Sequence, residues 1–374
     1  MTRRLQRRVW LEVDLRRLRA NFRKIAAAVK PAKVLCVLKA NAYGLGTKPY
    51  AAALSKTGCA GFGVAEPHEA LELLEFGKPV QILSSVLPDE VSGMVEAGVT
   101  LPVADLATAK LISAAAVRLK RAAKVHFKLD TGMGRLGIPA SDAIETIRAV
   151  KALPMLDCEG IFSHCPMAYD PADGFTEEQI AVFKSILGEL SKHSIRFAWR
   201  HIAASDAINN FPAAARPPFN LVRTGINLHG SFDPNGRRAL EVEPVLSLKT
   251  RVAQVRTLPA GTTLGYGRTW CLSKPTRVAT VSAGYADGLP LALTNRGHLI
   301  VNGVACPVIG RVSMDYTTLD VSRAGEVRPG DEVVALGGSG KIAVTPDDWA
   351  KLKGTHAYDI ICSFGNRVQR VYLG

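Results

Sequence analysis

Residues 37–46 read VLKANAYGLG, a stretch that joins an apolar run to a glycine-rich turn. An apolar run ends at Lys39, and a tyrosine in a glycine-rich turn follows at once. Lysine is mostly exposed in folded proteins, so Lys39 is either a polar residue at the mouth of a strand or a reactive amine. The pattern of the rest of the sequence is needed to distinguish these two roles of Lys39.

The chain before residue 235 alternates short apolar runs of β type with helical patterns. The segment 15–29 is the clearest helix, because its apolar residues recur on one face and Asp14 is suited to capping its first turn. Eight strands with helices between them are typical of a (β/α)8 barrel, and a doubly wound open sheet is the competing architecture. Strands are expected at 34–38, 61–65, 80–83, 100–103, 124–129, 158–162, 198–203 and 221–228, and further helices at 68–76, 89–97, 106–118, 141–153, 176–190 and 206–210.

The pattern changes near residue 235, where FDPNGRRA (232–239) is typical of a loop. Runs of β type follow, Asn302-Gly303 predicts a hairpin between two of them, and only 345–353 has a helical pattern. The sequence therefore predicts an α/β fold. A (β/α)8 barrel of the TIM type is expected over residues 10–235, followed by a mostly-β C-terminal domain over 236–374, with which residues 1–9 would pair.

Composition narrows the class of protein. Of the 374 residues, 47% are hydrophobic and 21% charged, which is typical of soluble globular proteins, and no apolar run reaches the ~20 residues of a membrane helix. Seven cysteines without a Cys-x-x-Cys pair fit reduced thiols in the cytoplasm. The net charge of +14 raises nucleic acid as a partner, but the spacings of nucleic-acid-binding motifs are absent. We expect no nucleic-acid partner, no membrane and no metal.

Active sites of such barrels lie at the carboxyl ends of the strands. Taken singly, the polar residues expected there have structural explanations: a core histidine, a helix cap, a space-making glycine or a surface charge. Together they describe a cup with an amine, several cations and a phosphate site, which this fold usually builds after its seventh and eighth strands. The residues are Lys39, Lys128, Arg135, His164, Ser205, Arg223, Gly225 and Ile226.

A buried lysine beside a phosphate cup suggests pyridoxal 5′-phosphate, whose aldehyde condenses with a lysine as a Schiff base. Arg223, on the last expected strand, could then face the pyridine nitrogen. A guanidinium is a permanent donor, so that nitrogen would stay unprotonated and the ring would be a weaker electron sink than one paired with a carboxylate.

At this point the chain resembles the alanine racemases, pyridoxal phosphate barrels followed by a β domain, over nearly its whole length. The lysine motif and the GRVSMD motif are the specific parts of the resemblance. The motifs are VLKANAYG (37–44), HFKLDTGMGRLG (126–137), LVRTGI (221–226), GYGRTW (265–270), GYADG (284–288), CPVIGRVSMD (306–315) and the C-terminal TxxYD and RVQRVY within 355–372.

The resemblance implies two catalytic bases, Lys39 on one face of the substrate and Tyr266 of a partner subunit on the other, so the active unit would be a homodimer with shared sites. A tyrosine has a pKa near ~10, and the Arg223–His201 pair would supply the cationic surroundings that it needs. Lys128 matches a lysine that is carbamylated in many relatives. The remaining implied roles are cofactor binding by Tyr43, His164, Ser205, Arg223, Gly225, Ile226 and Tyr358, substrate binding by Arg135 and Met314, and support from Lys128, His201 and Asp315.

The implied activity is the interconversion of L-alanine and D-alanine by proton transfer at Cα, which supplies D-alanine for peptidoglycan. A broad-specificity or serine-preferring racemase and a barrel-type amino-acid decarboxylase are the alternatives among enzymes. A cofactor-binding barrel without activity would not need the β domain or Tyr266. Departures from the family pattern at Leu45, Ala204, His229 and 163–170 leave the preferred amino acid open.

Overall fold

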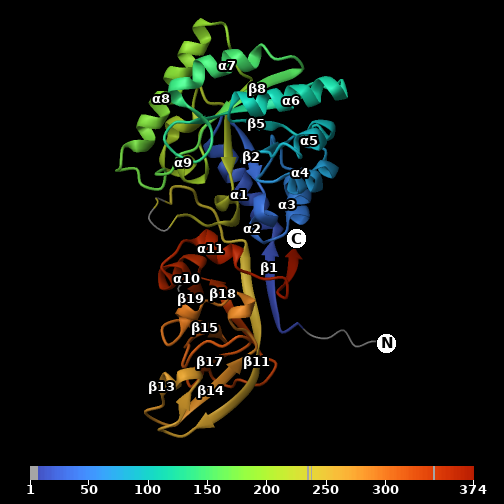
Figure 1. Cartoon of the computed structure of the whole chain (residues 1–374). Coiled ribbons are helices and arrows are strands. Elements are labelled where there is room, and N and C mark those ends of the chain that lie inside the picture. Colours follow the sequence, from blue (N-terminus) through green and yellow to red (C-terminus); the bar gives the residue numbers. More distant parts are fainter. Residues whose placement is uncertain (1–6, 234–235, 237, 340–341) are drawn as a thin grey trace. The chain divides into compact units, whose positions relative to one another are not determined.

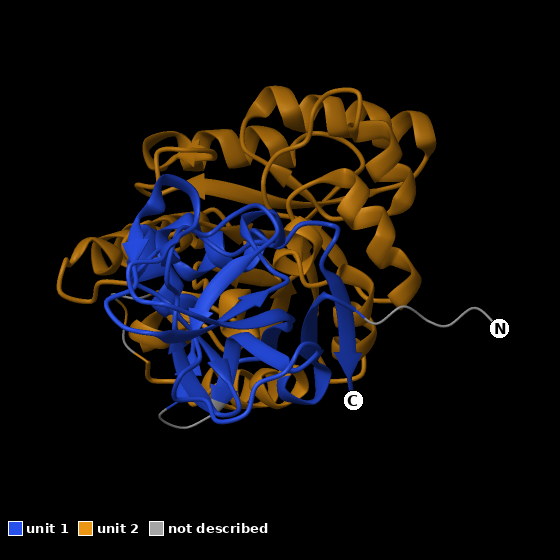
Figure 2. Cartoon of the chain, turned by 90° about the horizontal axis from the view of Figure 1, so that it is seen from below, with its two compact units in different colours: residues 1–17, 244–374 blue, residues 18–243 orange. Residues whose placement is uncertain are grey.

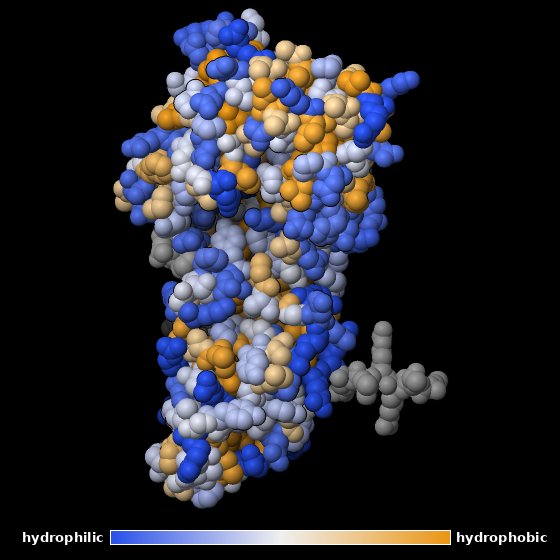
Figure 3. All heavy atoms as spheres, in the orientation of Figure 1, coloured by the Kyte–Doolittle hydropathy of each residue, from blue (hydrophilic) through white to orange (hydrophobic). Residues whose placement is uncertain are grey.

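The computed structural model describes residues 7–233, 236, 238–339 and 342–374, which form two compact units (Figure 1). Unit 1 combines the chain up to Arg17 with Pro244–Gly374, and unit 2 is Leu18–Glu243; Figure 2 colours them separately. In Figure 3, hydrophobic residues are scattered among hydrophilic ones over the visible face, as is normal for a globular protein.

Unit 2 is a closed barrel of eight parallel strands, counted over the part of the chain that is described. Most of these strands are largely buried, as expected for a parallel sheet that helices cover, whereas β8 and β9 are only partly buried. The strands are β2 (Lys33–Val37), β3 (Gly61–Val64), β4 (Val80–Ile82), β5 (Leu101–Val103), β6 (Ala123–Asp130), β8 (Leu156–Phe162), β9 (Trp199–His201) and β10 (Leu221–Thr224).

Two groups of strands, β10-β2-β3-β4 and β5-β6-β8-β9, are joined at both edges. A parallel bridge between Gln81 and Thr100 links β4 to the start of β5. The backbone N–H of Arg223 donates to the Ala203 carbonyl at 3.0 Å, which connects β10 to the segment after β9. The (β/α)8 fold class predicted from the sequence is therefore confirmed.

Helices follow the barrel strands along the chain. Leu18, Phe22 and Ile25 of α1 are buried, and the Asp14 carboxylate accepts the backbone N–H groups of Arg16 and Arg17, so it caps this helix as predicted. The helices are α1 (Leu15–Ala28), α3 (Thr47–Leu54), α4 (Pro67–Leu73), α5 (Val91–Ala97), α6 (Leu106–Leu119), α7 (Ala143–Lys151), α8 (Phe175–Lys192) and α9 (Ser205–Asn210).

Two local expectations were wrong. Residues 226–228 do not extend the last barrel strand, because the chain turns at Gly225 into a 3-10 helix over Ile226–His229. The segment 47–54, for which no helix was predicted, forms α3. The helix expected over 141–153 is present as the 3-10 turn Ala140–Asp142 followed by α7.

Unit 1 is built on a mostly antiparallel sheet with the order β16-β15-β18-β11-β1-β20, to which β14, β17 and β19 are attached. The predicted hairpin is present: Asn302 and Gly303 both have positive φ and join β15 to β16. The strands are β1 (Val9–Asp14), β11 (Leu246–Leu258), β14 (Thr276–Val281), β15 (His298–Val301), β16 (Val304–Pro307), β17 (Thr317–Asp320), β18 (Glu332–Ser339), β19 (Ile342–Val344) and β20 (Gln369–Leu373), with the small pair β12 (Thr263–Leu264) and β13 (Trp270–Cys271).

The expected helix over 345–353 is present as α10 (Pro346–Lys353), and a second helix, α11 (Ala357–Cys362), follows it. Within the described ranges, no helix combines the length and the apolar character that crossing a bilayer requires.

The division between the units differs from the one expected after residue 235. It falls between Glu243 and Pro244. At the other end, residues 10–17 belong to unit 1 rather than to the barrel, because β1 pairs with both β11 and β20. Of the N-terminal segment expected to pair with the β domain, Val9 lies opposite Thr250, and residues 1–6 lie outside the described part.

Leu11 lies in β1 between β11 and β20 and is fully buried, so the sheet of unit 1 depends on it. We expect Leu11→Ala to lower the free energy of unfolding by about 2–5 kcal/mol, since a cavity would replace most of the side chain. Urea unfolding followed by circular dichroism measures the change. The exposed Leu87→Ala is the control, and equal midpoints for both variants would contradict the prediction.

Candidate active site

The chain makes a left-handed turn directly after β2, at the residues quoted at the start of the sequence analysis. Lys39 opens the turn α2 (Lys39–Tyr43), in which Ala40, Asn41, Ala42 and Tyr43 all have φ between 50° and 59°. Non-glycine residues avoid this conformation, which costs roughly 1–2 kcal/mol per residue. Lys39 is exposed at the carboxyl end of the strand, so the expectation of a buried lysine was wrong.

Two side chains hold the strained turn in place. Glu69 of α4 accepts the backbone N–H of Ala40 with one carboxylate oxygen and that of Ala65, at 2.9 Å, with the other. The Asn41 side chain accepts the backbone N–H of Thr47 at 2.9 Å, and asparagine tolerates the left-handed region better than most residues. Glu69 was not among the residues predicted for the site, although a glutamate in the first turn of a helix after a strand is a recognisable N-terminal signal.

The end of the turn meets the loop after the last barrel strand. A Cβ on Gly225 would lie 2.1 Å from the Tyr43 hydroxyl oxygen, so only glycine permits this approach. The backbone N–H of Gly225 donates to Ser205 Oγ at 3.0 Å. Tyr43, Ser205 and Gly225 therefore form one small cup with the adjacent Ile226. The positions after the strands predicted Ser205, Gly225 and Ile226 there, and the family resemblance implied Tyr43.

Behind the cup lies a pair of aromatic residues that the sequence analysis did not interpret. The His229 ring packs edge-on against Tyr43 with a centroid distance of 4.9 Å, and the Tyr50 hydroxyl lies 3.0 Å from His229 Nδ1. Burial lowers the pKa of His229 to about 3, so the ring is neutral. His229, one of the departures from the family pattern, thus supports the Tyr43 ring.

Arg223 is buried at the end of β10, and its guanidinium has several protein acceptors. Nη1 donates to His201 Nδ1 at 2.9 Å, and Nη2 donates to the carbonyl oxygens of Ser163 at 2.7 Å and Ile202 at 3.1 Å. Burial lowers the pKa of Arg223 to about 10, which still leaves it charged at neutral pH. Burial, the Arg223 charge and His126 lower the pKa of His201 well below its usual value, so Arg223 carries the positive charge of this pair alone.

Cationic side chains converge at the same edge of the barrel. Burial and the charges of Arg135, Arg223 and Lys39 lower the pKa of Lys128 to about 8. Burial and the same three cations, together with Lys128, lower the pKa of His164 to about 3. Lys128 Nζ donates to the carbonyl oxygens of Leu83 at 2.7 Å and Ser84 at 3.2 Å. An excess of positive charge at a strand edge favours anionic ligands such as phosphate or carboxylate.

The other predicted site residues lie in unit 1. Tyr266 lies in a 3-10 turn and is 73% exposed, Met314 is 52% exposed, and Tyr358 is on α11 beside His356. The loop that carries Met314 lies beside the loop at Tyr285, since the backbone N–H of Tyr285 donates to the Ser313 carbonyl and that of Ala286 to the Met314 carbonyl. The turn of Tyr266 lies against the same segment, because a Cβ on Gly265 would lie 2.8 Å from the backbone nitrogen of Arg311.

Arg367, the first residue of the RVQRVY motif, braces these loops, a role that the motif did not indicate. Its guanidinium donates to both carboxylate oxygens of the buried Asp287, at 2.7 and 3.1 Å, and to Asp315 at 2.8 Å. The Asp287 carboxylate also accepts the backbone N–H of Gly284 at 3.0 Å. The predicted supporting residue Asp315 is therefore held by Arg367.

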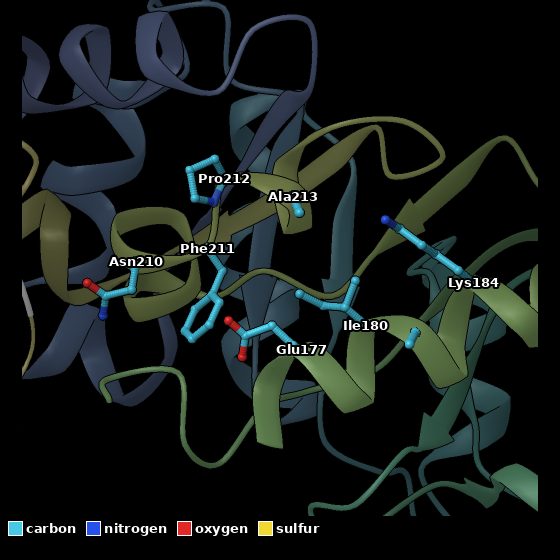
Figure 4. A pocket seen from close by; sticks show the side chains of 8 residues that line it. Glu177, Ile180, Lys184, Asn210, Phe211, Pro212 and Ala213 are labelled. Atoms are coloured by element: carbon cyan, nitrogen blue, oxygen red, sulfur yellow. The ribbon is translucent and has the colours of Figure 1, made fainter. Parts of the chain in front are cut away.

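A separate pocket of about 380 Å³ lies on the outside of the barrel (Figure 4). Four residues of α8, among them Glu177 and Lys184, line one side, and residues 210–213 line the other. None of the predicted site residues lines it, so this pocket is not part of the candidate active site.

The chain has the features of a class of two-unit barrel enzymes. These features are the cup and the cationic side chains at the carboxyl ends of the barrel strands, and the β unit that follows the barrel in sequence. Residues 13–233 match the family described as "Alanine racemase, N-terminal domain", and residues 245–372 match "Alanine racemase, C-terminal domain". The chain belongs to the alanine racemase family, as its motifs indicated.

Individual relatives agree over the full length. An alanine racemase of Desulforamulus reducens is 36% identical over 372 residues, which cover 98% of this chain and 99% of that protein. The crystal structure of alanine racemase from a D-cycloserine-producing Streptomyces lavendulae has a TM-score of 0.91 at 33% identity and covers 99% of this chain and 98% of its own. That of alanine racemase from Bartonella henselae with covalently bound pyridoxal phosphate has a TM-score of 0.88 at 27% identity and covers 98% of this chain and 100% of its own.

The approach of Tyr43 to Gly225 gives a direct test of the cup. We expect Gly225→Ala to weaken the binding of pyridoxal phosphate roughly tenfold or more, because the new methyl group would displace the Tyr43 hydroxyl. Titration of the cofactor by fluorescence quenching measures the affinity. Gly188→Ala is the matched control, since a Cβ there meets nothing within 4 Å, and equal affinities would show that the cup does not bind the cofactor.

Proposed function

We propose that the chain interconverts L-alanine and D-alanine with pyridoxal 5′-phosphate as its cofactor, and that this reaction supplies D-alanine for peptidoglycan in the cytoplasm. Membership of the alanine racemase family over both units carries the proposal. The covalently bound pyridoxal phosphate of the Bartonella henselae relative supports the choice of cofactor. The cytoplasmic location is consistent with the cysteines, none of which forms a disulfide in the described chain.

The residues present fit the cofactor. Tyr43, Ser205 and the glycine cradle at Gly225 would hold the phosphate together with Ile226 and Tyr358, and Lys39 would form the covalent bond. His164 and Arg223 would contact the ring. Arg223 can only donate hydrogen bonds, so it would keep a facing ring nitrogen unprotonated. When bound, pyridoxal phosphate withdraws electrons from Cα of the attached amino acid and so makes the Cα proton acidic.

Each face of the substrate would have its own base. The Lys39 amine would take or return the Cα proton on one face, and the Tyr266 phenol would do the same on the other. Each group acts as the base in one direction and as the acid in the other, so turnover in either direction needs both. Arg135 and the backbone N–H of Met314 would bind the substrate carboxylate, and the cations around Lys128 favour an anion there.

The active unit would be a homodimer in which Lys39 of one subunit and Tyr266 of the other serve the same substrate. The exposure of large apolar side chains on neighbouring loops of unit 1 supports this proposal, because a partner subunit would cover them. Besides Tyr266 and Met314, these side chains are Tyr285 and Tyr316.

Carbamylation of Lys128 stays a prediction. The reaction with carbon dioxide needs a neutral amine, and a pKa of about 8 leaves a larger neutral fraction at pH 7 than an ordinary lysine has. The carbamate anion would offset the charge of Arg135 and Arg223, which are two of the three cations that lower this pKa.

The activity is tested by a racemisation assay on L-alanine, L-serine and a longer L-amino acid, with and without added pyridoxal phosphate. We expect the cofactor-loaded protein to act on L-alanine, whereas Lys39→Ala should lose both turnover and the visible absorbance of the protein-bound cofactor. Decarboxylation without racemisation, or a preference for serine, would favour one of the alternative enzymes. Borohydride labelling of a lysine other than Lys39 would contradict the assignment of the covalent bond.

Shared sites predict complementation between inactive chains. We expect a mixture of Lys39→Ala and Tyr266→Phe chains to recover part of the activity after subunit exchange, because one of the two composite sites in each mixed dimer keeps both bases. Differently tagged chains purified as the mixed dimer provide the sample, and each variant alone is the control. Mixed dimers without activity would show that both bases come from the same chain.

A further inference from the structure

Among the residues that the structure describes, no carboxylate contacts the guanidinium of Arg223 directly. Its acceptors among the described residues are the carbonyl oxygens of Ser163, His201 and Ile202 and the imidazoles of His201 and His164. A buried charge is costly unless hydrogen bonds and an opposite charge compensate it. The hydrogen bonds are present, so the remaining question is which group supplies the negative charge.

The hydrogen bonds determine which atom donates and which accepts along a chain of side-chain contacts that starts at Arg223. A guanidinium has only donors, so His201 Nδ1 must accept, and the proton of this neutral ring lies on Nε2. His201 Nε2 lies 3.1 Å from His126 Nδ1 and donates to it. His126 Nδ1 also accepts from the Gln81 amide at 3.0 Å, so the proton of His126 lies on its own Nε2.

The chain ends at a carboxylate. His126 Nε2 lies 3.5 Å from Glu159 Oε1, which is a contact between the ring and the carboxylate rather than a hydrogen bond, and this nitrogen has no hydrogen-bond partner in the described part of the protein. Burial lowers the pKa of His126 against the opposing effect of Glu159, so the ring is neutral. Were it protonated, both its nitrogens would donate, and His201 Nε2 would meet a donor instead of an acceptor. A chain of side-chain contacts therefore runs from the cation Arg223 through His201 and His126 to the anion Glu159.

The local backbone is built to place this carboxylate. Val125 of β6 pairs with Cys158 of β8, whereas His126 pairs with Gly160, so Glu159 is the extra residue of a β-bulge. Bulges change the direction in which a side chain points and occur often beside active sites. A Cβ on Gly160 would lie within 2.5 Å of three atoms of the His126 ring, so the ring occupies the space that a side chain would take. The bulge therefore sets the direction of Glu159, and Gly160 leaves room for the His126 ring.

Other contacts hold Arg223 and His201 at one end of this chain of contacts and Glu159 at the other. The His201 ring stacks on Phe162 at a centroid distance of 5.0 Å, and Arg223 also lies over Phe162. Thr100 Oγ1 donates to Glu159 Oε1 at 3.2 Å, and Lys124 Nζ lies 3.8 Å from the other carboxylate oxygen. Burial would raise the pKa of Glu159, but His126, Lys124 and Thr100 outweigh it and the pKa is lowered, so the group is ionised.

We propose that Glu159 is a positioning residue that balances the charge of Arg223 through His126 and His201 and so fixes the guanidinium toward the cofactor ring. The charge relation concerns only groups of this chain, whereas its effect on catalysis rests on the proposed function. Glu159 touches neither substrate nor cofactor in this arrangement, so it acts by holding two imidazoles in one tautomer.

A double-mutant cycle in the cofactor-loaded protein tests the charge relation without reference to activity. Glu159→Gln keeps an acceptor oxygen but removes the charge, and we expect it to lower the melting temperature by roughly 2–4 °C. In an Arg223→Leu background the same change should shift the melting temperature much less, because no buried cation remains to be balanced. The exposed contact with Lys124 is lost in both backgrounds and cancels from the comparison.

Two further variants sharpen the test. Asp157→Asn removes an exposed carboxylate from the same strand and should leave melting temperature and turnover unchanged. Glu159→Asp keeps the charge, and in both measurements it should lie closer to the parent protein than Glu159→Gln does. If Glu159→Gln does not fold, the cycle is run with Glu159→Ala, which also removes the charge. Equal shifts in the two Arg223 backgrounds would overturn the proposal.

The catalytic consequence has its own measurement. We expect Glu159→Gln to lower kcat for alanine racemisation several-fold with a smaller change in KM, and to move the visible absorbance maximum of the bound cofactor, since the guanidinium faces its ring. An unchanged kcat and spectrum in a folded variant would overturn the role toward the cofactor. If the parent protein does not racemise alanine, the proposed function fails, but the melting-temperature cycle still decides the charge relation.

Discussion

The parallel pairing of β10 with β2 is the constraint on which the rest of the site depends. It aligns Leu221–Thr224 with Lys33–Cys36, two segments from opposite ends of unit 2. Because parallel strands end at the same edge, the turn after β2 meets the loop after β10, and Tyr43 reaches Gly225. Neither segment could form the cup alone, and closure of the barrel also gives every strand two neighbours, which leaves no edge to be covered.

Closure also explains how the strained turn persists. Four consecutive non-glycine residues in the left-handed region would not hold this conformation in an isolated peptide. Here Glu69 fixes the start of the turn, Asn41 bonds to Thr47, and the Tyr43 ring is buried against His229. Strain of this kind is kept where the surrounding structure over-determines it, and it is concentrated at sites of function. The turn places Lys39 at the mouth of the barrel rather than inside the wall.

The site has an excess of positive charge. Lys39, Lys128, Arg135 and Arg223 are close enough for their repulsion to contribute to the lowered pKa values of Lys128 and His164. Such an arrangement is unfavourable by itself and becomes favourable when anions bind, which suits a cofactor phosphate and a substrate carboxylate. Arg223 is the exception, because it is buried and, in the arrangement proposed above, Glu159 balances its charge through two neutral imidazoles.

The sequence by itself determined the barrel, the β unit and the family, because strand periodicity, turn residues such as Asn302-Gly303 and the VLKANAYG motif are local signals. It also indicated the residues at the strand ends, since position after a strand implies position at one edge. It did not show that β1 pairs with β11 and β20, and it gave no role to Glu69, Arg367 or the His126–Glu159 contact. These features depend on which strands pair and in which register. The bulge at Glu159 exists only through the pairing of β8 with β6, and the choice of neighbours for β1 is made between strands far apart in the chain. Local patterns carry no information about such partners, so only the tertiary structure decided them.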